Sequence, residues 1–314
     1  MSQLEELTKP YNLITVLGAT AGGKTAFAAY LAAILNREII SADSRQVYRR
    51  MDIGTGKDLD DYIVEGKQVA VHLIDIVEPG YKYNVFEYQQ DFVNTFKEIQ
   101  SRGKNAIMCG GSGMYLEAVI KDYELINVPH NPTLREELEK QSMDKLVHKL
   151  EAYKSLHNIS DTSDKKRLIR AIEIADYYAN KPTEKDRLPD LTHLVLGIKF
   201  DRDSRRRRIS QRLKQRLENG MIEEVQALIN EGVDKETLIY YGLEYKYITQ
   251  YIYGQISYNE MFTGLETAIH QFAKRQMTWF RRMERNGIKI HWLDGYMSTD
   301  DKINRVQEIV SKFE

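Results

Sequence analysis

The sequence predicts an α/β fold in which helices flank a parallel sheet, with a helical insertion and a helical C-terminal region. Within residues 1–121, short apolar runs alternate with helical patterns, as they do in doubly wound sheets. A charged, helix-rich stretch then interrupts this alternation, and another apolar run follows at residues 193–200. We therefore expect one sheet domain that the chain leaves and then enters again.

The composition fits one such core with an appended lobe. A chain of 314 residues exceeds the usual size of a single core but is short for two full domains. Hydrophobic residues make up 42% and charged residues 29%, which excludes a disordered or a membrane-embedded protein. The formal net charge is only -1, so any nucleic-acid partner must be held by local basic patches.

The cysteine content and the N-terminal sequence indicate the cellular compartment in which the protein is expected. Cys109 is the single cysteine, which excludes a disulfide framework and a multi-cysteine metal site, as expected of a reducing cytoplasm. The acidic N-terminus lacks a signal-peptide pattern, and the apolar runs stay below membrane-spanning length. We therefore expect a cytoplasmic protein with no membrane partner. We also expect a monomer, although the sequence itself leaves the oligomeric state open.

The predicted strands are short apolar runs. The first, at residues 12–17, ends in a glycine-rich turn, and a helical pattern over residues 25–35 follows at once. Further strands are predicted at residues 38–41, 72–76, 105–109 and 193–200, and further helices at residues 84–102 and 113–121.

Three segments follow from this order. Residues 1–121 are the first part of the core, and residues 122–189 are a helical insertion with helices at 133–153 and 163–178. Residues 190–314 are the second part of the core. This last segment is mostly helical from residue 201 to about residue 286 and then has a strand-like run at His291 and Trp292.

The strongest functional signal is the motif from Gly18 to Thr25, which lies between a predicted strand and a predicted helix, where a P-loop belongs. Glycines let backbone amides close around a phosphate, Lys24 adds a positive charge, and the Thr25 hydroxyl can bind Mg²⁺. The motif leaves open whether the phosphate belongs to a nucleotide or to another leaving group. The predicted phosphate-binding residues of this P-loop NTPase-like core are Gly18, Ala19, Thr20, Ala21, Gly22, Gly23, Lys24 and Thr25.

Two acidic residues and a second glycine-rich turn extend the candidate site. Asp43 follows the second predicted strand, and the carboxyl ends of parallel strands face the ligand crevice. An aspartate at a strand end is as often a helix cap as a catalyst. Asp75 is the alternative carboxylate on the magnesium side. Ser112 lies in the second turn, which can line the same crevice or serve only in packing.

Two basic tracts are the remaining candidates. Residues 205–216 carry seven cations and no acid, and helical spacing aligns Arg208, Arg212 and Arg216 on one face. Residues 274–282 mix cations with aromatic side chains, a composition suited to RNA phosphates and bases. Each tract by itself is also typical of a solvated helix face.

Taken together, these motifs resemble the tRNA dimethylallyltransferases (tRNA isopentenyltransferases) of the bacterial type. The resemblance covers most of the chain and follows the family's order. Besides the P-loop, the matching motifs are at residues 40–48, 51–55, 110–115, 167–173 and 273–281.

The resemblance implies that a dimethylallyl group moves from dimethylallyl diphosphate to N6 of the adenosine 3′-adjacent to the anticodon of tRNA. It implies Mg²⁺ as cofactor, with Thr25 as its ligand and with Asp43 or Asp75 as the candidate second ligand. Asp43 is then the general base, and Thr25 and Arg212 are catalytic with it. The implied tRNA-binding residues are Asp43, Ser44, Arg45, Gln46, Ser112, Lys166, Arg167, Leu168, Ile169, Arg170, Tyr241, Gly242, Lys274, Arg275 and Arg281.

The chain departs from the family pattern at four places. Ala19 stands for Pro, Gly22 for Ser or Ala, Gly56-Lys57-Asp58 for Ala-Lys-Pro, and Gly242-Leu243-Glu244-Tyr245 for Gly-Tyr-Lys/Arg-Glu. These departures leave open a related enzyme with an altered substrate. A nucleotide or metabolite kinase, an isopentenyltransferase acting on free adenine nucleotides, and a non-catalytic RNA-binding NTPase are the alternative functions.

Overall fold

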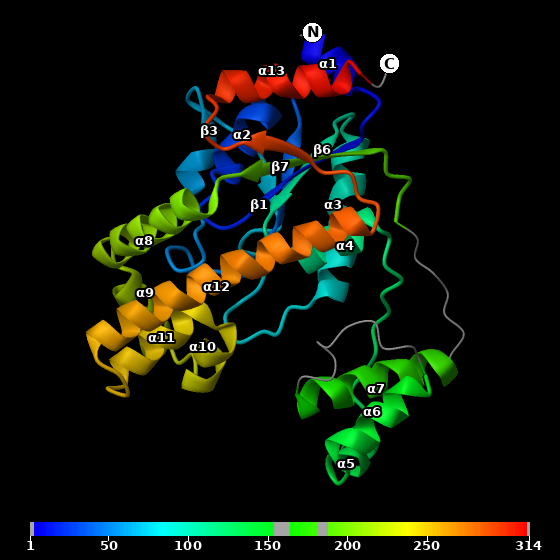
Figure 1. The fold of residues 1–314 in the computed structure, drawn as a ribbon, viewed down its shortest axis with the longest axis vertical. Coiled ribbons are helices and arrows are strands. Elements are labelled where there is room, and N and C mark those ends of the chain that lie inside the picture. The colour runs from blue at the N-terminus through cyan, green and yellow to red at the C-terminus, as the bar shows by residue number, and fades with distance from the viewer. Residues whose placement is uncertain (1–2, 154–163, 181–187, 313–314) are drawn as a thin grey trace. The chain divides into compact units, whose positions relative to one another are not determined.

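The protein consists of two compact units in the computed structural model, which describes residues 3–153, 164–180 and 188–312 (Figure 1). The sheet unit spans Met1–Tyr123 and Leu188–Glu314, and the insertion unit spans Glu124–Arg187. The predicted insertion, residues 122–189, contains the whole insertion unit. Each described helix is too short or too polar to cross a membrane.

The sheet unit is built on a six-stranded sheet whose paired strands all run parallel. The strand order is β5-β2-β6-β1-β7-β8, so consecutive strands are joined by crossovers. The predicted parallel α/β core is therefore confirmed. The strands are β1 (Leu13–Gly18), β2 (Glu38–Ala42), β5 (Val71–His72), β6 (Ala106–Gly110), β7 (His193–Lys199) and β8 (His291–Asp294).

Helices cover both faces of this sheet, because successive side chains of a strand point to opposite faces. On β1, Leu13 and Leu17 belong to one buried cluster, whereas Ile14 and Val16 belong to another. Figure 1 shows α13 and α12 on opposite sides of the strands. The second cluster is covered by α1 (Gln3–Thr8), α2 (Lys24–Ile34) and α13 (Thr299–Val310).

The first cluster is covered by the remaining helices of the sheet unit. Two of them come from the first part of the core, namely α3 (Val85–Ser101) and α4 (Gly113–Ile120). The C-terminal region contributes the other five, as predicted from its helical pattern. They are α8 (Arg202–Glu218), α9 (Met221–Asn230), α10 (Lys235–Tyr241), α11 (Leu243–Ile252) and α12 (Tyr258–Arg285).

The predicted strand at residues 72–76 is wrong beyond His72. Leu73 and Asp75 have φ values of 60° and 56°, a left-handed backbone that a strand cannot contain. The chain turns there, and the amides of Ile76 and Val77 both donate to the Val47 carbonyl. Only Val71–His72 therefore pairs with β2.

Other elements differ from the sequence prediction. The single helix predicted at residues 133–153 is two helices, α5 (Pro132–Glu139) and α6 (Met143–Glu151). The first helix ends at its C-cap Lys140, and the second begins after its N-cap Ser142. The next helix, α7, spans Lys165–Asn180, and the predicted start at residue 163 lies outside the described residues. The elements that sequence reasoning missed are α1, α13, a 3-10 turn (Leu59–Tyr62) and the hairpin of β3 (Ile63–Val64) and β4 (Lys67–Gln68).

A buried carboxylate joins the parts of the insertion unit. The side chain of Glu173 on α7 is 1% exposed and accepts hydrogen bonds from Arg135, Arg170 and the Asn131 amide. Burial alone would raise the pKa of Glu173, but these hydrogen bonds outweigh it and lower the pKa to about 2. Glu173 therefore stabilises the fold of the insertion unit while it is ionised.

We expect Glu173→Gln to destabilise the insertion unit by about 1–3 kcal/mol at neutral pH, because two guanidinium groups lose a charged acceptor. The folded-state pKa lies below the usual 4.5, so this stability is present above pH 4.5 and is lost as the pH falls toward 2. Amide hydrogen exchange of α5 to α7 in the full chain measures it. Glu136→Gln, which removes an exposed ion pair with Lys140, should change little.

Candidate functional site

The predicted P-loop connects β1 to α2 at the carboxyl edge of the sheet. Gly18 lies so close to β7 that a Cβ atom there would be 2.9 Å from the Ile198 carbonyl oxygen. Ala21 and Gly23 have φ values of 59° and 69°, so the loop backbone curls before the helix begins. Gly23 is the N-cap of α2 and has no side chain to satisfy the first-turn amides. Those amides can bind an anion.

Lys24 lies half-buried at the start of α2, among other charged groups. Burial lowers the pKa of Lys24, and the positive charges of Arg212 and Arg216 act in the same direction. The Asp43 carboxylate opposes them. Several cations therefore share one site with a single strand-end carboxylate.

Helix α8 brings one row of arginines to this loop. Arg208 Nε donates to the Ala21 carbonyl at 2.9 Å, and Arg212 Nη2 donates to the Thr20 hydroxyl. Burial lowers the pKa of Arg212 to about 10, and the charge of Arg216 adds to the effect. The predicted alignment of these arginines on one helix face is confirmed, and that face points to the P-loop.

Gln276 on α12 is a site residue that sequence reasoning missed. Its Oε1 accepts from the Thr20 amide at 2.9 Å, and its Nε2 donates to the Gly111 carbonyl at 2.9 Å. This side chain therefore joins the P-loop to the second glycine-rich turn. In the sequence Gln276 is an uncharged residue within the second basic tract, and its burial and its two hydrogen bonds become visible only in the fold.

The second strand end lies beside the second glycine-rich turn, as expected for one crevice. Asp43 directly follows β2 and is half-buried, and its Oδ1 accepts from the Arg45 amide at 2.9 Å. The Ser44 amide donates to Ser112 Oγ at 3.0 Å. Gln46 is buried, and its Nε2 donates to the Gly56 carbonyl at 3.0 Å.

Asp75 has a different environment. Its carboxylate pairs with Lys57, whose side chain is fully buried and also lies 2.7 Å from Asp52 Oδ1. Arg49 donates to the Asp75 carbonyl at 2.8 Å. The contacts of Asp75 are therefore those of a structural ion pair, which leaves Asp43 as the better carboxylate for a magnesium site.

Three further acids near the P-loop were not predicted. Burial raises the pKa of Glu244, and Asp43 adds to this while Arg216 and Arg212 oppose it. Burial also raises the pKa of Asp61. Asp58 forms an ion pair with Arg216 at 3.1 Å. In the sequence Asp58 and Glu244 stand out only as departures from the family pattern. Their approach to the cations around the P-loop depends on contacts between distant segments.

The second basic tract contains three exposed cations and the half-buried Arg282. Arg282 pairs with the buried Glu117 at 2.6 Å, and its guanidinium carbon lies 3.9 Å from the centroid of the Trp279 ring. Lys274, Arg275 and Arg281 are exposed on α12. These three can therefore meet an external polyanion, whereas Arg282 holds α12 against α4.

The remaining predicted tRNA-binding residues have mixed surroundings. Lys166 and Arg167 are exposed, but Leu168 and Ile169 are buried in the core of the insertion unit, so a side-chain contact with RNA is wrong for these two. Arg170 donates to the Val128 carbonyl at 2.8 Å and pairs with Glu173.

Tyr241 is likewise buried, and its hydroxyl accepts from the Gly80 amide. The Arg45 guanidinium lies 5.5 Å from the centroid of its ring. Gly242 follows with a φ of 77°, which lets α10 turn into α11. The Tyr241 hydroxyl is therefore engaged within the protein, and the Arg45 side chain lies over its ring.

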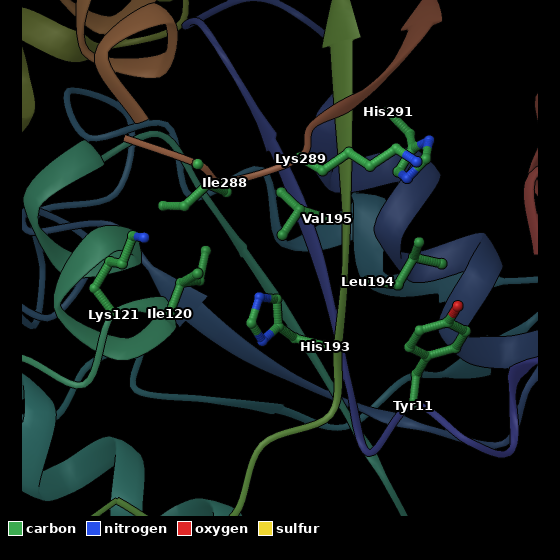
Figure 2. Close-up of a pocket in the computed structure, with 10 residues that line it drawn as sticks. Tyr11, Ile120, Lys121, His193, Leu194, Val195, Ile288, Lys289 and His291 are labelled. Carbon is green, nitrogen blue, oxygen red and sulfur yellow. The ribbon is translucent and has the colours of Figure 1, made fainter. Parts of the chain in front are cut away.

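A cavity of about 350 Å³ lies at the opposite edge of the sheet, where β7 and β8 begin (Figure 2). His193, His291 and Lys121 line it together with apolar side chains such as Val195. Burial lowers the pKa of both histidines. The cavity contains none of the predicted site residues, so the candidate site is the carboxyl edge with the P-loop.

Comparison with known proteins identifies the family of this chain. The model of the IPP transferase family matches residues 46–283. The tRNA dimethylallyltransferase 2 of Bacteroides fragilis (strain YCH46) is 57% identical over 308 residues, which cover 98% of this chain and 100% of that protein. This full-length match includes the P-loop and Asp43, which precede the family-model match.

Solved structures share the fold. A tRNA isopentenylpyrophosphate transferase from Bacillus halodurans superposes with a TM-score of 0.69 at 30% identity, and the match covers 96% of this chain and 95% of that one. A eukaryotic dimethylallyltransferase that acts on tRNA has a TM-score of 0.75 at 20% identity, covering 96% and 79%. The family match spans most of the chain and the relatives match nearly its whole length, so this protein belongs to the IPP transferase family.

Proposed function

We propose that this protein transfers the dimethylallyl group of dimethylallyl diphosphate to N6 of the adenosine 3′-adjacent to the anticodon in tRNA. The observation that carries the proposal is the convergence of Lys24, Arg212 and Asp43 at one sheet edge, with Arg212 bound to the P-loop. Such a site offers cations for a leaving diphosphate and a carboxylate for the incoming nucleophile. The relatives' names support the same reaction.

The nucleophile needs help from a base. The lone pair of the adenine N6 amine is delocalised into the ring, so the amine gains nucleophilicity if a proton leaves as the new C–N bond forms. Asp43 is half-buried, and one of its oxygens accepts only a backbone amide among the contacts of the described residues. We assign Asp43 as the group that accepts the N6 proton.

The leaving group needs positive charge. As the bond between C1 and the diphosphate oxygen breaks, its electron pair stays on the oxygen and the diphosphate gains negative charge. We assign the stabilisation of that charge to the first-turn amides of α2, Lys24 and Arg212, and the hydrogen bond of Arg212 to the P-loop supports this. Partial burial of these cations strengthens the effect, because the local dielectric constant is low.

Magnesium fits this donor set. Mg²⁺ prefers hard oxygen ligands and is usually bound by one or two protein oxygens together with phosphate oxygens and water. Thr25 supplies a hydroxyl at the first turn of α2, and Asp43 supplies a carboxylate near Lys24. When bound there, the ion would neutralise charge on the diphosphate.

The test is incubation of the full chain with bulk bacterial tRNA, Mg²⁺ and dimethylallyl diphosphate, followed by mass spectrometry of the digested tRNA. We expect dimethylallyl-adenosine next to the anticodon, and none when ATP replaces the diphosphate donor. Prenylated AMP or ATP without modified tRNA would favour an isopentenyltransferase on free nucleotides. Phosphate transfer from ATP without prenylation would favour a kinase.

RNA binding should depend on the exposed cations of α12. We expect Arg275→Ala and Arg281→Ala each to weaken tRNA binding and to flatten its log-log salt dependence by up to about 0.7 to 0.9 for each RNA phosphate no longer neutralised, because fewer condensed counterions are released. Salt titrations of tRNA binding measure the slope. Arg305→Ala on α13 removes an equal, exposed charge on the other side of the sheet and should leave the slope unchanged.

A further inference from the structure

Two residues that depart from the family pattern lie against one side chain, that of Arg216, which is one helical turn after Arg212 on α8. Asp58 Oδ2 lies 3.1 Å from its Nη2 atom. A Cβ atom on Gly56 would come within 3.0 Å of its guanidinium carbon, so a side chain there would displace the guanidinium group from this position. Arg216 is also the cation whose charge most lowers the pKa of Glu244.

The ion pair of Arg216 with Asp58 is a weak reason to bury an arginine. The Arg216 side chain is 11% exposed, whereas that of Asp58 is 54% exposed. An ion pair with one solvated partner contributes little to stability, but removing a guanidinium from water is costly. The pair therefore leaves Arg216 as a buried cation with incomplete compensation.

Arg216 shares its surroundings with the cations of the diphosphate site. The charges of Arg212 and Arg216 both lower the pKa of Lys24, which places all three groups in one electrostatic field. A concentration of like charges is unfavourable until an anion binds to it. The planar guanidinium group is suited to phosphate, because it can donate two parallel hydrogen bonds.

We propose that Arg216 is a second guanidinium for the donor diphosphate, and that Asp58 is an internal anion that holds it in place until the donor binds. This inference rests on the proposed function. Gly56 provides the space that the guanidinium needs in the resting position. Asp58 competes with the diphosphate for the same donors, so the two residues of one ion pair have opposite effects on donor binding.

The opposite effects are testable with inorganic diphosphate and Mg²⁺, titrated into the full chain in a calorimeter. Arg216→Met should weaken diphosphate binding about 10- to 100-fold, the range for loss of a charge-assisted hydrogen bond. Asp58→Asn should leave binding unchanged or make it up to about tenfold tighter, because the competing charge is gone. Lys214→Met removes an exposed cation two residues away and should change binding less than about twofold.

Two further variants guard against misfolding. Gly56→Ala should weaken diphosphate binding in the same direction as Arg216→Met, because its Cβ displaces the guanidinium, and a thermal melt must show that the strain of alanine at a φ of 73° leaves the protein folded. If Arg216→Met does not fold, Arg216→Lys keeps the charge but loses the planar fork, and its binding should fall between wild type and a full loss. Thermal melts of each variant identify the folded ones.

If Arg216→Met and Asp58→Asn weaken diphosphate binding equally, the ion pair only stabilises the loop, and this result would overturn the inference. So does normal diphosphate binding by folded Arg216→Met. Failure of the proposed function looks different, because wild type would then bind diphosphate without prenylating tRNA, or would not bind it. If wild type binds diphosphate without prenylating tRNA, the assignment of Arg216 to a diphosphate is retained. If wild type does not bind diphosphate, both the assignment and the proposed function are wrong.

Discussion

Asp43→Asn should lower kcat roughly 10²- to 10⁴-fold, the range for loss of a positioned general base. The substitution is well matched to the structure. Asp43 Oδ1 accepts from the Arg45 amide, and the asparagine oxygen can accept the same hydrogen bond, so the turn after β2 is preserved. Only the ability to accept the N6 proton is removed.

Asp43→Asn should not weaken substrate binding, although it lowers kcat. The Asp43 charge opposes the cations around Lys24, so its loss should leave the KM for dimethylallyl diphosphate unchanged or lower. The affinity for tRNA should stay near that of wild type. Single-turnover kinetics at saturating substrates, with separate binding titrations, measure these quantities.

The variant also separates two roles for Asp43. A lost magnesium ligand would raise the Mg²⁺ concentration needed for half-maximal rate, and excess Mg²⁺ would restore part of the activity. A lost base is not restored by Mg²⁺. Near-normal turnover of Asp43→Asn would mean that the carboxylate only caps the turn, and the base would have to be sought among other acids.

The P-loop and the sheet edge could be predicted because their signals are local. A glycine-rich motif between an apolar run and a helical pattern fixes strand, loop and helix at once, and the parallel sheet then places Asp43 at the same edge. The helical row from Arg208 to Arg216 could be predicted for the same reason, since spacing along one helix determines which side chains share a face.

What the sequence could not predict depends on contacts between distant segments. The hydrogen bonds of Gln276 join α12 to the P-loop across 256 positions of the chain, and the Arg216 to Asp58 ion pair spans 158. The misplaced strand at residues 72–76 has the same origin. Its apolar residues predict a strand, but the ion pair of Asp75 with Lys57 and the hydrogen bonds to the Val47 carbonyl stabilise a turn.

The two basic tracts should prove to serve different substrates. Arg212 is half-buried and bonded to Thr20 in the P-loop, so Arg212→Ala should lower kcat by roughly 10²- to 10³-fold, as removal of a group that stabilises developing charge does. Donor binding should weaken as well. tRNA affinity and its salt dependence should barely change, because Arg212 is not one of the exposed cations of α12 that we assign to tRNA.

Arg208→Ala distinguishes loss of a diphosphate contact from loss of support for the P-loop as the cause of the Arg212→Ala defect. Arg208 also donates to the P-loop, at the Ala21 carbonyl, and lies one turn earlier on α8. If these arginines only support the loop, the two variants should have similar defects. If Arg212 meets the leaving diphosphate, its replacement should be much the more harmful, and Arg212→Lys should recover part of the rate because it keeps the charge without the planar fork. A salt slope for tRNA binding that flattens in Arg212→Ala, and stays as in wild type in Arg275→Ala and Arg281→Ala, would mean that the two tracts have been assigned to the wrong substrates.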